Sequence, residues 1–167
     1  MTPSSDLGWP AGVVGVDRGA DGDPEEYGDV SFWTVASVLR DPCEGQATVA
    51  PGPSVRDLAG ALRAQPGHRT TRPRPVEVDG YSGLYLEVTL PAQQQINGCH
   101  DSEQMLWRTD DGNGYGGNIA GTISRLWILD VRGTRVVMVA GTTPNESADE
   151  VAEVLAIAAS THFIDPV

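Results

Sequence analysis

The chain has 167 residues, with 11 arginines and no lysine against 23 acidic residues, so its formal net charge is −12. That length suits a single domain with its own hydrophobic core. The negative charge makes nucleic acids and anionic membrane surfaces poor partners, because both carry charge of the same sign. No stretch approaches the roughly 18 consecutive apolar residues that a membrane-spanning helix needs.

Residues 1–26 are rich in glycine, proline, serine and acidic residues. They predict a flexible acidic connector ahead of a single domain at residues 27–167. Five carboxylates between Asp17 and Glu26 raise the alternative of a calcium loop, but their spacing does not match the alternating ligands of an EF-hand. The first residues also lack the basic start and the apolar run of a signal peptide.

A strand and a helix are expected next. Residues 30–39 are mostly β-branched and aromatic, and they predict one long strand. Ser54, followed three residues later by Asp57, predicts a capped helix that ends before Pro66. The apolar positions of this helix recur with helical spacing, which predicts one buried stripe. The stripe consists of Val55, Leu58, Ala59 and Leu62.

The middle of the chain predicts a hairpin and a further strand. Residues 75–78 are expected to pair with residues 84–90 across a turn at residues 79–83. Apolar and polar side chains alternate in the second of these strands, so one face of the sheet is expected to contact the core. Residues 103–109 predict another strand, which ends in a glycine-rich surface loop at residues 110–117.

The C-terminal part predicts a second hairpin and a second helix. Residues 125–131 and 134–140 have the clearest strand patterns of the chain, and residues 132–133 are expected to join them in a tight turn. Ser147-x-x-Glu150 is a capping box, which predicts the start of the last helix. Val151, Val154, Leu155 and Ala158 are expected on one side of that helix.

The order of these elements predicts the fold class. A short strand is expected to close the domain at residues 162–164. The strands are connected by hairpins rather than by alternating strand–helix units. We therefore expect an α+β fold, with a mostly antiparallel sheet and two main helices packed on it.

The two cysteines, Cys43 and Cys99, predict a disulfide. They have neither the close spacing of a C-x-x-C pair nor a second Cys/His cluster that would complete a zinc site. The alternative is two separate buried thiols. A disulfide closing this loop is worth roughly 4 kcal/mol in the chain-entropy model. It also predicts an extracytoplasmic location, secreted or anchored at the outer face of the cytoplasmic membrane, which requires a signal or anchor outside this sequence.

The glycine-rich segment matches two binding motifs incompletely. Residues 112–117 fit the G-x-G-x-x-G pattern, but dinucleotide binding needs a helix after the loop, and residues 122–131 have a strand pattern. Counted from Thr109, the segment also resembles the start of an EF-hand loop, yet Ala120 stands where a bidentate glutamate is required. We therefore expect a mobile surface loop with no cofactor.

Metal and catalytic signatures are also incomplete. Cys99, His100 and Asp101 would suit zinc only if Cys99 were reduced. Residues 80–83 are one residue short of the G-x-S-x-G pattern of a nucleophile elbow and stand between two predicted strands. The sequence therefore predicts no metal site and no catalytic residue.

Aromatic residues supply the candidate ligand site. Four of them stand on predicted strands, and the fifth lies in the glycine-rich loop. Strand aromatics usually fill a core. If they share a face that no helix covers, they would line an apolar pocket instead. The candidates are Trp33, Tyr85, Trp107, Tyr115 and Trp127.

Several segments carry a resemblance to a known group of proteins. Residues 33–43, 51–59, 78–87 and 125–131 resemble uncharacterised extracytoplasmic domains of actinobacteria, which occur as lipoproteins or after a membrane anchor. The use of arginine for every basic position agrees with the GC-rich coding of such a source. The order of elements is more distantly similar to that of PsbP-like lipoproteins. The resemblance implies a location and a fold but transfers no catalytic residue.

Together these features predict a non-enzymatic binding or sensor domain that recognises a small ligand or an envelope partner protein. The alternatives are a structural interaction module of an envelope complex and an enzyme whose active site has no sequence signature. An enzyme requires acids or histidines with perturbed pKa values in a pocket. A binding domain shows an apolar pocket without them, and an interaction module shows an exposed apolar patch.

Overall fold

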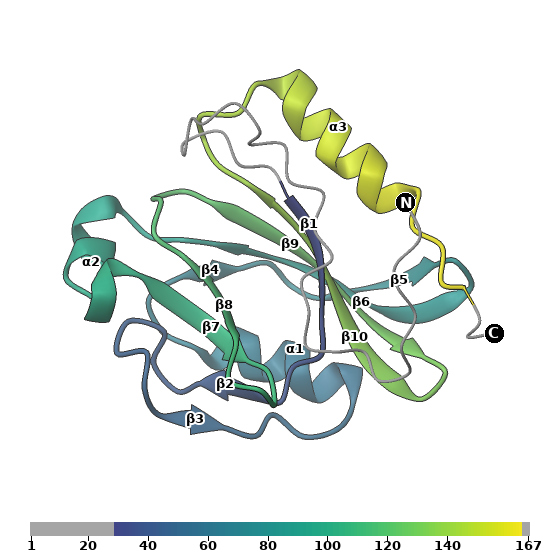
Figure 1. Cartoon of the computed structure of the whole chain (residues 1–167), viewed down its shortest axis with the longest axis horizontal. Coiled ribbons are helices and arrows are strands. Elements are labelled where there is room, and N and C mark those ends of the chain that lie inside the picture. Colours follow the sequence, from purple (N-terminus) through teal and green to yellow (C-terminus); the bar gives the residue numbers. More distant parts are fainter. Residues whose placement is uncertain (1–28, 165–167) are drawn as a thin grey trace.

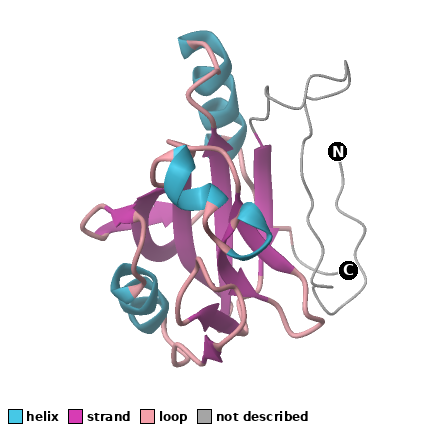
Figure 2. Ribbon diagram, turned by 90° about the vertical axis from the view of Figure 1, so that its left-hand side faces the viewer, coloured by secondary structure: helices cyan, strands magenta, loops and turns pink. Residues whose placement is uncertain are grey.

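A computed structural model describes residues 29–164, which form two antiparallel sheets and three α-helices (Figure 1). The predicted α+β class is confirmed. The strands fill the centre of the molecule and the helices lie at its periphery (Figure 1 and Figure 2). The predicted connector at residues 1–26, with its calcium candidate, lies outside the described residues.

The larger sheet has six strands in the order β1-β10-β9-β6-β4, and β5 also pairs with β6. Its central strands β6, β9 and β10 are the longest of the described chain, with nine residues each. The six strands are β1 (Asp29–Trp33), β4 (Arg69–Thr70), β5 (Arg74–Val78), β6 (Tyr81–Thr89), β9 (Ile123–Val131) and β10 (Thr134–Thr142).

The smaller sheet has four strands in the order β3-β2-β7-β8. They are β2 (Ser37–Leu39), β3 (Thr48–Val49), β7 (Gln104–Arg108) and β8 (Gly114–Gly117). The helices are α1 (Val55–Ala64), α2 (Gln93–Asn97) and α3 (Ala148–Ala159), and a short 3-10 helix covers His100–Ser102.

The two faces of the six-stranded sheet are covered differently. The inner face contacts α1 and the four-stranded sheet through a buried cluster that includes Leu86, Ile128 and Val137. The outer face contacts α3, whose Val154 and Ala158 pack on Val30, Met138 and Ala140. The two main helices therefore pack on opposite faces of this sheet, which agrees with the alternating side chains predicted for its strands.

Both main helices begin as predicted. Ser54 accepts a hydrogen bond from the backbone of Asp57, whose side chain accepts one from the backbone of Ser54. Ser147 and Glu150 form the same reciprocal box at the start of α3. These bonds satisfy backbone amides that the first turn of a helix leaves unpaired.

The predicted hairpins are present with two-residue turns. Asp79 and Gly80 join β5 to β6, and Arg132 and Gly133 join β9 to β10. All four have φ between 51° and 82°, as a type I′ turn requires. The first turn is shorter than predicted, because Tyr81 already begins β6.

The prediction of one long strand at residues 30–39 was wrong. β1 pairs with β10 in the six-stranded sheet, whereas β2 pairs with β7 in the four-stranded sheet. The chain therefore changes sheets at residues 34–36, where the backbone amide of Ala36 donates to the carbonyl of Arg108 at 3.0 Å. The partner strands decide this change, and they are distant in sequence.

The glycine-rich segment is not the predicted surface loop over its whole length. Gly114–Gly117 forms β8, which pairs with β7. A Cβ atom on Gly116 would lie 2.0 Å from the carbonyl oxygen of Gln104. Glycine is therefore needed here because the two backbones approach too closely for a side chain.

The predicted closing strand at residues 162–164 is also absent. The backbone amide of Phe163 donates to Oδ2 of Asp79 at 2.7 Å, and the Phe163 ring packs edge-on against Tyr81 at 5.5 Å. Hydrogen bonds from His162 first, and then from Phe163, hold the pKa of Asp79 below its usual value. Side-chain contacts rather than strand pairing thus attach this segment to the sheet.

None of the helices in the described part of the chain is long and apolar enough to cross a membrane.

Candidate functional site

Three of the five candidate aromatic residues lie together between the inner face of the six-stranded sheet and the four-stranded sheet. Trp107 is fully buried and stacks on Tyr115 with ring centroids 4.7 Å apart. Trp33 meets both rings edge-on, at 6.0 Å from Trp107 and 5.5 Å from Tyr115. Burial, together with the nearby Asp29, raises the pKa of Tyr115 far above its usual value. This trio fills the core between the two sheets.

The other two candidates lie on the outer face. Tyr85 and Trp127 are cross-strand partners, and their rings meet edge-on at 5.0 Å. The Arg74 guanidinium lies over the Tyr85 ring at 4.6 Å, and the Tyr85 hydroxyl donates to Glu87 at 2.7 Å. Burial, and then Glu87, raise the pKa of Tyr85 to about 12. The sheet separates this pair from the inner trio, so the five residues do not line one common pocket.

The predicted disulfide between Cys43 and Cys99 is present, with their Cα atoms 4.6 Å apart. Cys99 directly follows α2 and Cys43 follows β2, so the bond connects the end of the short helix to the four-stranded sheet. Because its sulfur is bonded to Cys43, Cys99 has no thiolate to offer as a zinc ligand. Its neighbours His100 and Asp101 instead pair with each other at 3.1 Å.

Within residues 29–164, no group of three or more His, Cys, Asp or Glu side chains is arranged to hold a metal ion. Asp111 belongs to the partial EF-hand motif that begins at Thr109. Its carboxylate accepts hydrogen bonds from Thr109 and from the side chain of Asn113. Hydrogen bonds, with Thr109 first, lower the pKa of Asp111. These bonds hold the turn between β7 and β8.

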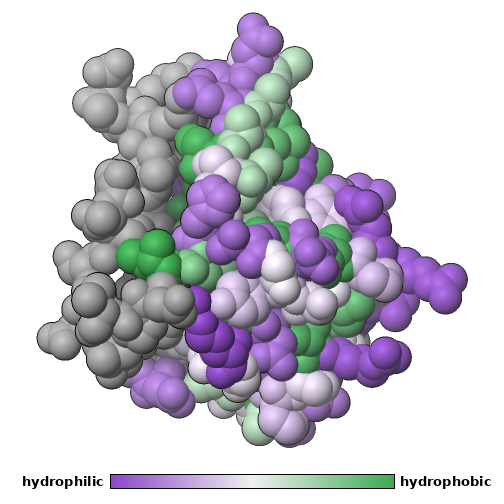
Figure 3. All heavy atoms as spheres, turned by 90° about the vertical axis from the view of Figure 1, so that its right-hand side faces the viewer, coloured by the Kyte–Doolittle hydropathy of each residue, from purple (hydrophilic) through white to green (hydrophobic). Residues whose placement is uncertain are grey.

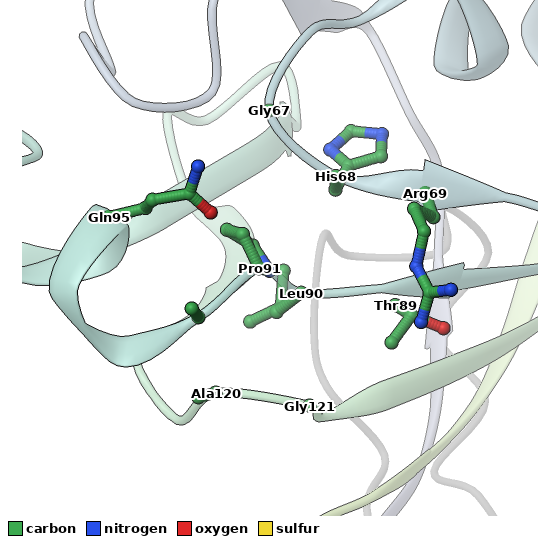
Figure 4. A pocket seen from close by; sticks show the side chains of 10 residues that line it. Gly67, His68, Arg69, Thr89, Leu90, Pro91, Gln95, Ala120 and Gly121 are labelled. Carbon is green, nitrogen blue, oxygen red and sulfur yellow. The ribbon is translucent and has the colours of Figure 1, made fainter.

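A cleft of about 470 Å³ lies at one end of the six-stranded sheet. It is lined by four segments: residues 67–69 at the start of β4, residues 89–92 at the end of β6, Gln95 of α2, and residues 120–121 before β9. In the close view, Gln95 stands on one side, His68 and Arg69 on the other, and Leu90 and Pro91 between them (Figure 4).

Backbone and amide hydrogen bonds hold the lining segments together. The backbone amide of Leu90 donates to the carbonyl of Thr122 at 3.0 Å, and that of Gly121 donates to the carbonyl of Leu90 at 3.3 Å. The side chain of Gln93 donates to the carbonyl of Asn118 and accepts from the amide of Ala120. Because α2 is tied to the loop before β9 in this way, the cleft is formed in advance of any ligand.

His68 is the only histidine of the cleft, and its ring is largely enclosed. Its Nε2 hydrogen bonds to the carbonyl of Leu62 at 3.3 Å, and its Nδ1 is buried without a hydrogen-bond partner among the described residues. Burial lowers the pKa of His68, and the Leu62 carbonyl and the Gln104 amide offset part of that shift. Burial therefore favours the neutral form of the ring.

Gln104 connects the wall of the cleft to the disulfide. Its side chain is buried, and its Nε2 donates to Sγ of Cys99 at 3.8 Å. A Cβ atom on Gly67 would lie 3.1 Å from the same Nε2, so Gln104 lies directly behind the backbone of Gly67. The disulfide and this buried amide thus support the wall that Gly67 and His68 form.

A second cavity, of about 340 Å³, lies beside the disulfide and is lined mostly by polar side chains, including Gln46, Glu103 and Arg108. His100 contributes Nδ1 to Asp101 and Nε2 to the Gln46 amide, at 3.1 and 3.2 Å. These side chains of His100 and Asp101 are 52% and 79% exposed. No lining residue of this cavity carries a hydroxyl or thiol that the histidine would activate.

Sequence reasoning did not find the cleft. Its lining comes from four segments that are far apart along the chain, and no helix was predicted at α2, where only Ile96 of the five residues is apolar.

Comparisons of the chain with protein-family models, with curated proteins and with solved structures found no match. The expected likeness to extracytoplasmic domains of actinobacteria, and to the element order of PsbP-like lipoproteins, therefore stays a prediction.

Proposed function

We propose that this protein is a non-enzymatic binding or sensor domain that recognises a small ligand in the cleft between α2, β4 and β6. The observation that carries the proposal is the lining of that cleft. Its walls are mainly backbone and apolar side chains, and among the described residues that line it only Arg69 and His68 are ionisable. Its volume of about 470 Å³ falls within the range that small-molecule sites occupy.

The chemistry of these groups favours binding over catalysis. The Nε2 atom of His68 hydrogen bonds to the Leu62 carbonyl, and burial favours the neutral form of the ring. The guanidinium of Arg69 donates hydrogen bonds but has no acceptor atom, so it cannot act as a general base. In the described part of the chain, the lining contains neither a carboxylate nor a thiol. Such a site can orient a ligand through hydrogen bonds and charge, but it has no pair of groups poised for proton transfer.

Exposed apolar surface gives less support to an interaction module. Among the described residues, the exposed large apolar side chains are Val49 and Ile164, which stand on different segments of the chain. Figure 3 looks onto the side that carries α3, and in its coloured part polar residues interrupt the apolar ones. A docking patch typically covers several hundred Å² of continuous apolar surface.

The extracytoplasmic part of the proposal is supported by the disulfide. Disulfides persist in oxidising compartments and are rare in reducing cytosol. Cys43 and Cys99 are both engaged in the bond, and the described residues contain no free cysteine. This is the support for our proposal that the domain lies outside the cytoplasmic membrane, secreted or anchored.

Amide NMR with a small-molecule fragment library tests the proposal. We expect binding fragments to shift the amide signals of Leu90, Gln95 and Gly121, which line the cleft. Ala92→Trp fills the cleft from its rim and should abolish these shifts. Ala152→Trp is the matched control, because Ala152 is exposed on α3, away from the cleft.

Fragment shifts that persist in the Ala92→Trp protein, or that gather on the outer face around Trp127, would contradict the proposed site. A library that shifts none of the cleft signals would contradict it as well.

A further inference from the structure

The cleft differs from the rest of the chain in its charge. The protein has 23 acidic residues against 11 arginines, yet among residues 29–164 no acidic residue lines the cleft, and one arginine does. The only other ionisable group there is His68, whose pKa is lowered by burial. The described lining of the cleft therefore carries one positive charge and no negative charge, in a protein of net charge −12.

We infer that the ligand of this cleft is a small organic anion, with a carboxylate, sulfonate or phosphonate head group at Arg69 and an apolar body along Leu90, Pro91 and Ala120. The inference rests on the proposed function and names the class of ligand. It follows from the combination of one unopposed cation with apolar walls.

Arg69 is positioned to serve as the anion ligand. It belongs to β4, where it is the cross-strand partner of Thr89, so two strands hold its backbone. Its side chain extends toward that of Thr89, on the side of the cleft away from Gln95 (Figure 4). Within the described part of the chain, no carboxylate lies in salt-bridge distance of it. A guanidinium can donate two parallel hydrogen bonds to such a head group.

The opposite side of the cleft suits the remainder of the ligand. Pro91 and Ala92 lead into α2, and Ala120 faces them from the loop before β9. The Gln95 side chain is exposed at this rim and can donate or accept a hydrogen bond. A cationic ligand would meet Arg69 without any compensating carboxylate, which makes it a poor occupant.

Two fluorescent probes of nearly equal shape test the inference. 8-Anilino-1-naphthalenesulfonate and N-phenyl-1-naphthylamine share the same ring system, and only the first carries a negative charge. We expect the sulfonate to bind more tightly than the amine. Arg69→Gln should weaken the binding of the sulfonate about fivefold, because one partly exposed charge pair contributes about that much to affinity. It should leave the binding of the amine unchanged.

Arg72→Gln is the matched control, because Arg72 is exposed three residues further along the chain and does not line the cleft. Ala92→Trp should remove the binding of both probes.

The outcomes separate the two claims. Suppose that Ala92→Trp abolishes the binding of both probes, but Arg69→Gln leaves the affinity for the sulfonate unchanged or lowers the affinity for both probes equally. The ligand is then not selected by the charge of Arg69, so the inference is wrong, while the cleft remains a binding site. If both probes bind the Ala92→Trp protein as well as the unchanged protein, the cleft is not the site and the proposed function fails first.

Discussion

Similar aromatic residues lie on the two sides of the six-stranded sheet, in different surroundings. Trp107 is fully buried against Tyr115 between the two sheets. Trp127 on the outer face is half-buried beside Tyr85, and an arginine side chain covers that tyrosine. The surroundings differ because a second sheet covers the inner face, whereas a single helix and neighbouring side chains cover the outer face. An aromatic residue on a strand therefore has no fixed role until its cover is known.

Truncating one tryptophan on each face gives the largest expected contrast. Trp107→Ala should lower the free energy of unfolding by about 3–5 kcal/mol, because it leaves a cavity in a closed core. Trp127→Ala should cost about 1–2 kcal/mol, since less of its apolar area is buried. Urea denaturation measures both. Equal losses would mean that the outer face is as tightly packed as the inner one.

Removing the disulfide tests the covalent support of the inner side. Replacing both Cys43 and Cys99 by serine should lower the free energy of unfolding by about 4 kcal/mol, as expected from the 56-residue separation. Amide hydrogen exchange should show a greater loss of protection in β7 and α2 than in α3, because the bond lies next to the first two. Uniform loss across both faces would contradict this local role.

The close contact of β8 with β7 gives a smaller effect. Gly116→Ala should cost about 1–3 kcal/mol, because the new Cβ atom would overlap the backbone of Gln104. Gly60→Ala is the control: Gly60 is exposed in α1 with nothing within 4 Å of a new Cβ atom, so alanine there should gain about 0.5–1 kcal/mol. A stable Gly116→Ala protein would show that β8 can move away from β7.

The smallest effect concerns pH. Burial lowers the pKa of His68 below its ordinary value of 6.5, so the unfolded chain binds more protons than the folded one just below that pH. The free energy of unfolding should therefore fall as the pH drops below 6.5. The decrease should stop once the pH is below the pKa that His68 has in the folded protein. His68→Gln should flatten this part of the pH profile of thermal melting, while His100→Gln should keep it. A slope that survives His68→Gln would assign it to another group.

Local signals in the sequence predicted the elements whose causes are local. The capping boxes at Ser54 and Ser147 and the turn at Arg132 were predicted because a few neighbouring residues determine them. The disulfide was also predicted, since the two cysteines match neither the spacing of a C-x-x-C pair nor the ligand set of a zinc site.

Elements that depend on distant partners were not predicted. The break between β1 and β2 follows from pairing with β10 and β7, which residues 30–39 do not reveal. Most of the candidate aromatic residues do stand on strands, as predicted. The face on which each ring lies, and the elements that cover that face, depend on the whole sheet. The cleft was missed for the same reason, because residues from four segments meet only after the sheet has formed.

The pairing of β1 with β10 also has a consequence for how the domain is made. Asp29 is the register partner of Gly141, so nearly the whole described chain lies between the two strands. During synthesis or export from the N-terminus, β1 stays without this neighbour until β10 has emerged, and such distant pairings form slowly. The assembly of the domain therefore cannot be completed from its N-terminal half. A chain shortened before β10 would present β1 as an unpaired edge, which is prone to aggregation.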